Sequence, residues 1–111
     1  MEKDLGKSST GIQPNVAALL SYFMGFISGI IFFLIEKDNK FVRFHAMQSI
    51  IAFGAIYVLY LLSPYVPVIG EILIPILRIG SLILWIVCMI KAYQGEKFKL
   101  PVIGDIAEQK I

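Results

Sequence analysis

Two long stretches of this chain carry no charged side chain, and this feature constrains the fold more than any other. Residues 16–35 and residues 44–70 contain no Asp, Glu, Lys or Arg. Twenty residues of helix rise about 30 Å, which matches the hydrocarbon thickness of a bilayer. Hydrophobic residues make up 58% of the 111 residues and charged residues 16%, whereas soluble domains have about 45–50% and about 25%. So small a chain cannot hide this much apolar surface from water, so we expect the lipid bilayer to be its solvent.

The apolar runs predict an all-α fold, an integral membrane helical bundle of about three transmembrane helices. They form one transmembrane domain over residues 15–93, with expected spans at about residues 16–35, 42–62 and 68–93. Pro64 and Pro67 end the second span, because proline and the residue before it disfavour helix. We expect the third span to be one long helix kinked near Pro75. A short re-entrant piece at 68–77, followed by a shorter span, is the alternative.

The two ends of the chain are polar. Residues 1–14 combine mixed charges with Gly, Ser, Thr and Pro, a composition typical of a mobile tail. Residues 94–111 form a second polar tail. Within it, a helix opening at Pro101 would place Val102, Ile103, Ile106 and Ala107 on one side, which indicates a possible short helix on the membrane surface.

Small residues recur every four positions in the first predicted span, at Ser21, Gly25 and Gly29. On one helix they form a helix-packing strip that lets another backbone approach closely. The neighbour could be the second or third helix of the same chain, or another copy. Glycine also weakens a helix, so Gly25 and Gly29 could bend or break this span.

Basic residues near the spans predict the orientation, because Lys and Arg in short loops favour the cytoplasmic side. The 36–45 loop carries three basic residues and the chain after residue 90 carries four, whereas the 63–71 loop carries none. We therefore expect a multi-pass protein of the cell membrane with the 36–45 loop and the C-terminus cytoplasmic and the N-terminus outside. If the first helix does not cross the membrane, the N-terminus is cytoplasmic too.

A polar cluster opens the second span, at Arg43, His45 and Gln48. His45 and Gln48 are three residues apart and share a helix face, whereas Arg43 points away and could reach lipid phosphates or the carboxylates of the first loop. One interpretation is that these are interfacial residues satisfied by water and a neighbouring helix. The other is a polar site inside the bundle, where polar groups in membranes usually lie. In that case His45 would make stability or partner binding depend on pH.

Arg78 is a second candidate, because it lies between Leu77 and Ile79 in an apolar run. An arginine deep in lipid costs at least about 2.5 kcal/mol. Arg78 could extend toward Glu71 or lipid headgroups near the outer interface. Alternatively, it could pair with a polar group on the first or second helix.

Patterns that support catalysis or cofactor binding are absent from the sequence. The chain has one histidine and one cysteine, too few for a multi-histidine or multi-cysteine metal site. It has no glycine-rich phosphate loop and no G-x-S-x-G motif. Cys88 lies in an apolar run and is interpreted as a small packing residue. We expect no enzyme activity, no cofactor or metal and, with a net charge of +2, no nucleic-acid partner.

Three segments resemble a known family. They are Pro14 to Tyr22, Glu36 to Ser49 and Lys91 to Gly104, and together they are similar to small prokaryotic integral membrane proteins of uncharacterised function. That family is distantly similar to the twenty-kilodalton Tic subunit of the chloroplast protein import translocon. The resemblance implies that Phe41, Phe44, His45 and Gln48 are signature positions. It also implies a membrane protein with a part in protein translocation or membrane-complex assembly.

The sequence therefore favours a non-enzymatic protein that works by binding other membrane proteins or copies of itself within the lipid bilayer. Three helices of this length can hardly enclose a pore alone, so interaction or oligomerisation is expected. The alternative function is a small homo-oligomeric channel or transporter lined by His45, Gln48 and Arg78.

Overall fold

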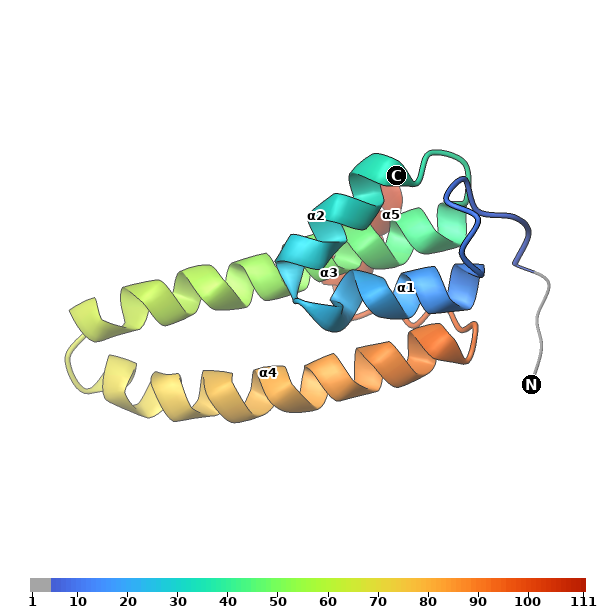
Figure 1. Cartoon of the computed structure of the whole chain (residues 1–111). Coiled ribbons are helices and arrows are strands. Elements are labelled where there is room, and N and C mark those ends of the chain that lie inside the picture. The colour runs from blue at the N-terminus through green and yellow to red at the C-terminus, as the bar shows by residue number, and fades with distance from the viewer. Residues whose placement is uncertain (1–4) are drawn as a thin grey trace.

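The computed structural model describes residues 5–111, which fold as five α-helices and one short 3₁₀ helix (Figure 1). The elements are α1 (Pro14–Phe23), α2 (Phe26–Ile35), α3 (Lys40–Leu62), η1 (Ser63–Tyr65), α4 (Ile69–Tyr93) and α5 (Ile103–Lys110). The prediction of an all-helical protein is confirmed. The prediction of about three transmembrane helices differs from the described residues, in which two helices are long and apolar enough to span. The first expected span is broken into two helices, as its glycines allowed, and the C-terminal tail contains the short helix α5.

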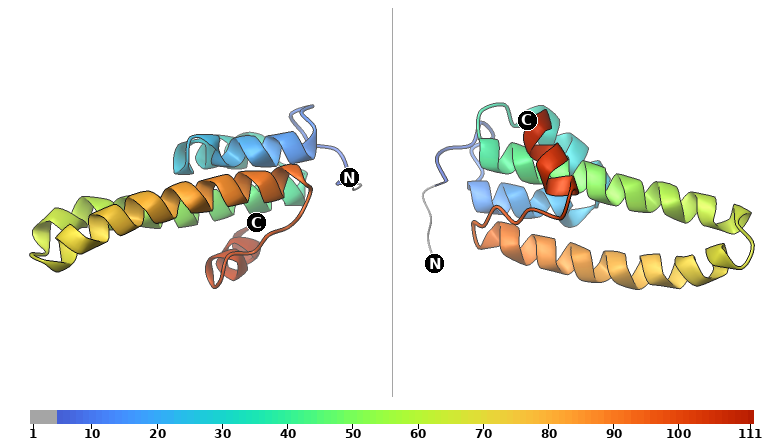
Figure 2. Two further views of the ribbon diagram at one scale, coloured as in Figure 1. Left: turned by 90° about the horizontal axis from the view of Figure 1, so that it is seen from below. Right: turned by 180° about the vertical axis from the view of Figure 1, so that it is seen from behind.

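The first expected span, residues 16–35, is broken at Gly25 into α1 and α2. Gly25 adopts φ +63°, a left-handed conformation that glycine adopts without steric cost. The Ser28 hydroxyl accepts a hydrogen bond from Met24 N (2.9 Å) and lies 3.0 Å from the Ser21 carbonyl oxygen, so it fixes the turn. α2 then runs back beside α1 (Figures 1 and 2). Each arm has ten residues, or about 15 Å of helix, which is half a hydrocarbon thickness.

The helices long and apolar enough to cross a membrane, within residues 5–111, are α3 and α4. They are antiparallel, and Gly70 allows the tight connection between them, since a Cβ there would lie 1.8 Å from the Ser63 carbonyl oxygen. α4 continues through Pro75 as one gently bowed helix (Figure 1). The alternative with a separate re-entrant piece at 68–77 is therefore wrong. Large apolar side chains along both helices, such as Val58 of α3 and Leu82 of α4, are more than half exposed, as lipid-facing residues would be.

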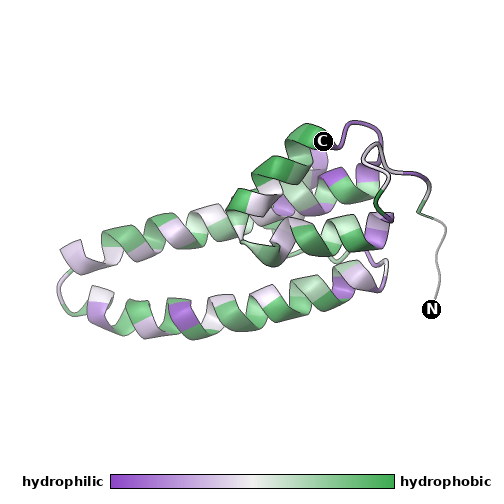
Figure 3. Ribbon diagram, viewed as in Figure 1, coloured by the Kyte–Doolittle hydropathy of each residue, from purple (hydrophilic) through white to green (hydrophobic). Residues whose placement is uncertain are grey.

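Polar segments gather at one end of the molecule (Figure 3). We call the group formed by residues 5–13, the Glu36–Asn39 loop and residues 94–111 the polar cap. Residues 5–13, expected to form a mobile tail, instead bond to the 36–39 loop through Ser9; the first four residues of that expected tail lie outside the described residues. Since the hairpin returns the chain to its starting end, residues 5–13 and the 36–39 loop lie together. This arrangement differs from the version with a crossing first helix and agrees with the alternative in which that helix does not cross.

The apolar core lies next to the polar cap, where α1, α3 and α4 meet. Its fully buried members include Ala18, Ala52, Cys88 and Ala92. Small side chains at these positions bring the three helices together. The far halves of α3 and α4 have no comparable core, and their contacts are sparse beyond Phe53.

Candidate functional site

The candidate site is a buried hydrogen-bonded network formed by Tyr22 of α1 with His45 and Gln48 of α3. All three side chains have no exposed surface. His45 and Gln48 lie on the same face of α3, as the three-residue spacing predicts, and this face points toward α1 and toward residues 94–100. We call residues 94–100 the strap, because this extended segment leads from the end of α4 back along α3 to α5 (Figure 2).

The positions of the protons in this network follow from its fixed partners. His45 Nε2 lies 3.0 Å from the Glu96 carbonyl oxygen, which can only accept, so Nε2 carries the proton. His45 Nδ1 then accepts from the Tyr22 hydroxyl at 2.7 Å. The pattern fits a neutral imidazole with both nitrogens bonded. A second proton on Nδ1 would remove the acceptor of the Tyr22 hydroxyl, so a response to pH would act through this network.

Gln48 completes the network and attaches the strap to α3. Its Nε2 donates to the Tyr22 hydroxyl oxygen (2.9 Å) and to the Phe98 carbonyl oxygen (2.8 Å). Its Oε1 accepts from Leu100 N–H (3.0 Å). In the described residues, every buried side-chain nitrogen and oxygen has a partner. The network therefore offers no open donor or acceptor to a substrate, and what it binds is the chain's own strap.

Aromatic rings enclose the imidazole on its other sides. Phe41 and Phe44 make edge-on contacts with His45, with ring centroids 4.6 and 5.2 Å away. Trp85 of α4 donates through Nε1 to the Tyr22 carbonyl oxygen, which ties α4 to the same point. The four positions that the family resemblance marks thus form one packed unit around His45.

Arg43 faces away from this network. Its Nη1 donates to the carbonyl oxygens of Phe33 (3.0 Å) and Glu36 (2.7 Å), and its guanidinium lies over the Phe33 ring. A cation here satisfies the last carbonyls of α2 and complements the helix dipole. The sequence suggested lipid phosphates or loop carboxylates as the partners of Arg43. In the structure its partners are instead the backbone carbonyls at the end of α2.

Glu36 anchors the N-terminal segment to the 36–39 loop, a structural role that the sequence analysis did not single out. Its carboxylate accepts from Ser9 N–H (2.8 Å), from the Ser9 hydroxyl (2.6 Å) and from Asn39 N–H (3.0 Å). The side chain has no exposed surface. Burial raises the pKa of this carboxyl, but the hydrogen bonds from Ser9, Asn39 and Asp38 outweigh burial and hold the pKa below its usual value.

A charged cluster joins the strap to α5. Lys99 Nζ lies 2.8 Å from an Asp105 carboxylate oxygen and 3.0 Å from one of Glu108, and Lys97 also bonds Glu108. Hydrogen bonds from Lys97 and Lys99 lower the pKa of Glu108 to about 2. Gly104 and Ala107 of α5 are buried against α3 and the strap, whereas Val102 and Ile106 stay exposed. The apolar side expected for this helix is thus only partly used.

Arg78 lies apart from the other candidates, on α4. Its Nη2 donates to the Tyr60 hydroxyl of α3 at 2.7 Å, and none of the ion pairs in the described residues includes it or Glu71. The structure thus brings His45 and Gln48 into one site and leaves Arg43 and Arg78 outside it. No group of three His, Cys, Asp or Glu side chains in residues 5–111 could hold a metal ion.

The small residues of the first expected span lie at helix contacts. A Cβ on Gly29 would lie 2.8 Å from the Ala46 carbonyl oxygen, so α2 approaches the α3 backbone closely there. Gly25 forms the turn, and its carbonyl accepts from the Ser49 hydroxyl (2.8 Å). Ser21 is buried and donates to the Ala17 carbonyl of its own helix.

Comparison with known proteins places this arrangement in a family. Residues 10–107 match the model of the magnetosome magnetite crystal formation protein family. A UPF0132 membrane protein of Methanocaldococcus jannaschii is 53% identical over 105 residues, covering 95% of this chain and 94% of that protein. A UPF0132 membrane protein of Archaeoglobus fulgidus is also 53% identical, covering 90% of this chain and 97% of that protein.

A more distant relative is the magnetosome protein MmsF of Paramagnetospirillum magneticum, 28% identical over 111 residues, with 98% of this chain and 99% of that protein covered. No solved structure matches the chain. These findings confirm the resemblance to small prokaryotic membrane proteins. They give no support to the distant similarity to the Tic subunit.

Proposed function

The chain belongs to the magnetosome magnetite crystal formation protein family, together with the UPF0132 membrane proteins, and from this premise we propose that it is a non-catalytic membrane component that binds a partner through its polar cap. α3 and α4 anchor the protein in the bilayer. The α1–α2 hairpin and the strap hold the cap in one conformation at one membrane face. The protein then works by binding and assembly.

The observation that carries this proposal is the internal use of the buried polar groups. The polar atoms of Tyr22, His45 and Gln48 bond to each other and to the strap. Buried networks of this kind rigidify the structure around them. Most exposed charges, such as Lys37, Lys97 and Asp105, lie on the cap, where charged groups set the specificity of an interface.

We further propose that the cap faces the cytoplasm, with α3 and α4 as the spans. Of the ten Lys and Arg residues, Lys3 lies outside the described residues, and eight of the other nine lie in or beside the cap; Arg78 is the exception. This bias follows the preference of basic residues for the cytoplasmic side. The hairpin, with its exposed apolar residues such as Ile27 and Leu34, enters the bilayer from the same side without crossing it.

A homo-oligomeric channel is less well supported. Two of its three expected lining residues, His45 and Gln48, have no exposed surface and no free polar atom. A part in protein translocation has no support beyond the Tic resemblance.

Site-specific photo-cross-linking in native membranes tests the proposal. A cross-linking amino acid replaces Lys37 or Asp105, both exposed on the cap, and the matched control replaces Tyr65, which is 83% exposed in the α3–α4 connection. We expect discrete protein adducts from the cap positions and none from position 65. Adducts from position 65 alone, or equal adducts from all three positions, would contradict the proposal.

A further inference from the structure

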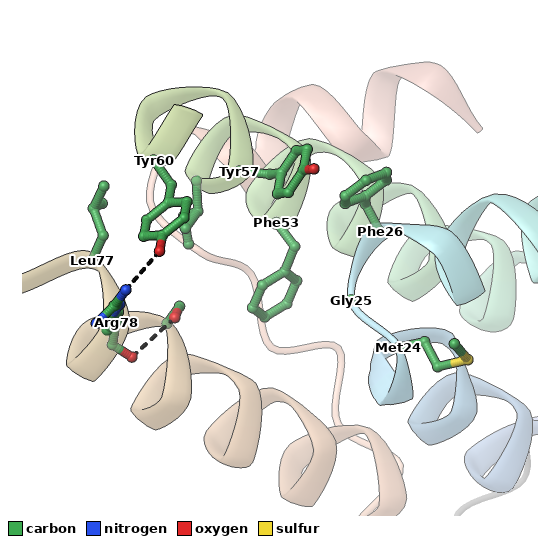
Figure 4. A pocket seen from close by; sticks show the side chains of 10 residues that line it. Met24, Gly25, Phe26, Phe53, Tyr57, Tyr60, Leu77 and Arg78 are labelled. Carbon is green, nitrogen blue, oxygen red and sulfur yellow. Dashed lines mark hydrogen bonds between the residues drawn. The ribbon is translucent and has the colours of Figure 1, made fainter. Parts of the chain in front are cut away.

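α3 and α4 enclose an open groove on the side away from the polar cap. The groove lies between α3 and α4 from Phe53 to the Arg78–Tyr60 hydrogen bond, and the turn of the α1–α2 hairpin closes it at its cap end (Figure 4). Two adjoining cavities of about 270 and 400 Å³ form it, and Phe53, Arg78 and Ser81 line both. This volume lies between the two helices that would cross the bilayer, so an occupant would enter it from the lipid.

One end of the groove is rich in hydrogen-bond donors. Arg78 reaches across from α4 to the Tyr60 hydroxyl on α3 (Figure 4). Since that hydroxyl oxygen accepts from Arg78, its own proton is left to donate. A guanidinium has five N–H donors, and the bond to Tyr60 is the one hydrogen bond that the Arg78 side chain makes within residues 5–111. No carboxylate of the described residues lies within ion-pair distance of it.

The rest of the groove is apolar. Toward the cap, its walls are Phe53, Leu82 and Trp85, with Met24 and Phe26 of the hairpin turn at its closed end. From Arg78 to Trp85 the wall extends seven residues, or about 10 Å along α4. The cationic donor group thus lies on the Ile69 side of the middle of α4, and an apolar channel leads away from it along α4 toward the cap. An amphiphile of the leaflet on that side has the same polarity, with its head outward and its tail inward.

We propose that this groove binds a membrane lipid with an anionic phosphate headgroup. The phosphate oxygens accept from the Arg78 guanidinium and the Tyr60 hydroxyl, and an acyl chain lies along Phe53 and Trp85. Arginine suits this role because its planar fork matches phosphate geometry. Neutralisation by the lipid also removes the main cost of an arginine in the apolar part of the protein, since an unpaired charge in lipid is expensive. The inference is independent of the partner of the polar cap.

Trp85 supplies a built-in reporter, because it is the only tryptophan of the chain and it lines the groove. The full-length protein is reconstituted in phosphatidylcholine vesicles that contain a small fraction of brominated phosphatidylglycerol or, in parallel, brominated phosphatidylcholine. Bromine quenches tryptophan on contact, so the ratio of quenching gives the relative occupancy of the groove. A single arginine–lipid attraction predicts about a fivefold preference for the anionic lipid.

Arg78→Gln should reduce this preference to about one, and Tyr60→Phe should reduce it in part. Lys91→Gln is the matched control, because it removes a positive charge from the same helix at a position that does not line the groove, and it should keep the wild-type ratio. Elution as a single species with unchanged Trp85 emission checks that each variant is folded.

Equal quenching by the two brominated lipids in the wild type would overturn the proposal. So would a preference that survives Arg78→Gln or that Lys91→Gln abolishes. Absence of quenching by either lipid would also show that the lipid proposal is wrong. If, in that case, Tyr60→Cys or Ser81→Cys cross-links two chains, a second copy of the protein fills the groove.

Discussion

Replacing Gln48 with leucine should release the strap from α3. Leucine fills a similar volume but has no donor or acceptor, so the Leu100 N–H and the Phe98 carbonyl lose their shared partner. A buried polar group left without a partner costs about 1–3 kcal/mol. The loss of both partners should therefore destabilise the docked strap by about 3 kcal/mol in all. A loss of about 3 kcal/mol changes the equilibrium between docked and released strap about 150-fold.

Hydrogen–deuterium exchange followed by mass spectrometry measures this release in detergent micelles. Peptides that cover residues 96–104 should exchange about 100-fold faster in the variant, while peptides from α4 keep the wild-type rate, because local opening exposes only the segment that detaches. Met47→Leu, a neighbouring change on α3 that removes no hydrogen bond, is the control and should leave the strap protected.

Two results would refute this reasoning. If strap exchange in Gln48→Leu stays near the wild-type rate, the two hydrogen bonds between Gln48 and the strap do not hold it. If α1, α3 and α4 all exchange faster together with the strap, the network stabilises the whole fold, and the inference that it only attaches the strap to α3 is wrong.

Three further changes test other parts of the structure. Tyr22→Phe leaves His45 Nδ1 without its donor and should lower the free energy of unfolding by about 1–3 kcal/mol, measured by thermal unfolding in detergent; an unchanged midpoint would contradict the network. Gly29→Ala should destabilise the α2–α3 contact by about 1–3 kcal/mol, whereas Gly54→Ala, where a Cβ meets nothing within 4 Å, should be neutral or stabilising in the same assay. Because hydrogen bonds hold the pKa of Glu36 below its usual value, its contribution is fully present above the ordinary glutamate pKa of about 4.3 and is lost as the pH falls through the lower folded value. A spin label at Lys7→Cys, in a Cys88→Ala background, should therefore become mobile in this acidic range, and Glu36→Gln should abolish that pH dependence; a label whose mobility ignores pH would disprove the anchor.

Much of the candidate site could be expected from residue types and spacing. His45 and Gln48 share a face because they are three residues apart, and a polar face in an apolar helix must find partners. Their partners could not be read from the sequence. Three of them are backbone groups of the strap. Because nearly every residue type has the same backbone carbonyl and amide, the sequence cannot show which of them bind a side chain. Tyr22 gave no signal either, since an interfacial tyrosine needs no buried partner.

The sequence by itself determined that this chain is helical and lipid-facing, since apolar runs of this length leave few other solutions. It also determined that the basic residues lie outside the apolar runs, apart from Arg78. Only the tertiary structure decided that the first run, residues 16–35, is two ten-residue helices and not one helix long enough to cross a bilayer. Composition cannot distinguish one helix of twenty residues from two of ten, and the decision lies in the turn at Gly25 and its contacts with α3. The same turn places residues 5–13 beside the 36–39 loop and closes the cap end of the groove that Arg78 lines. It also positions Tyr22 against His45.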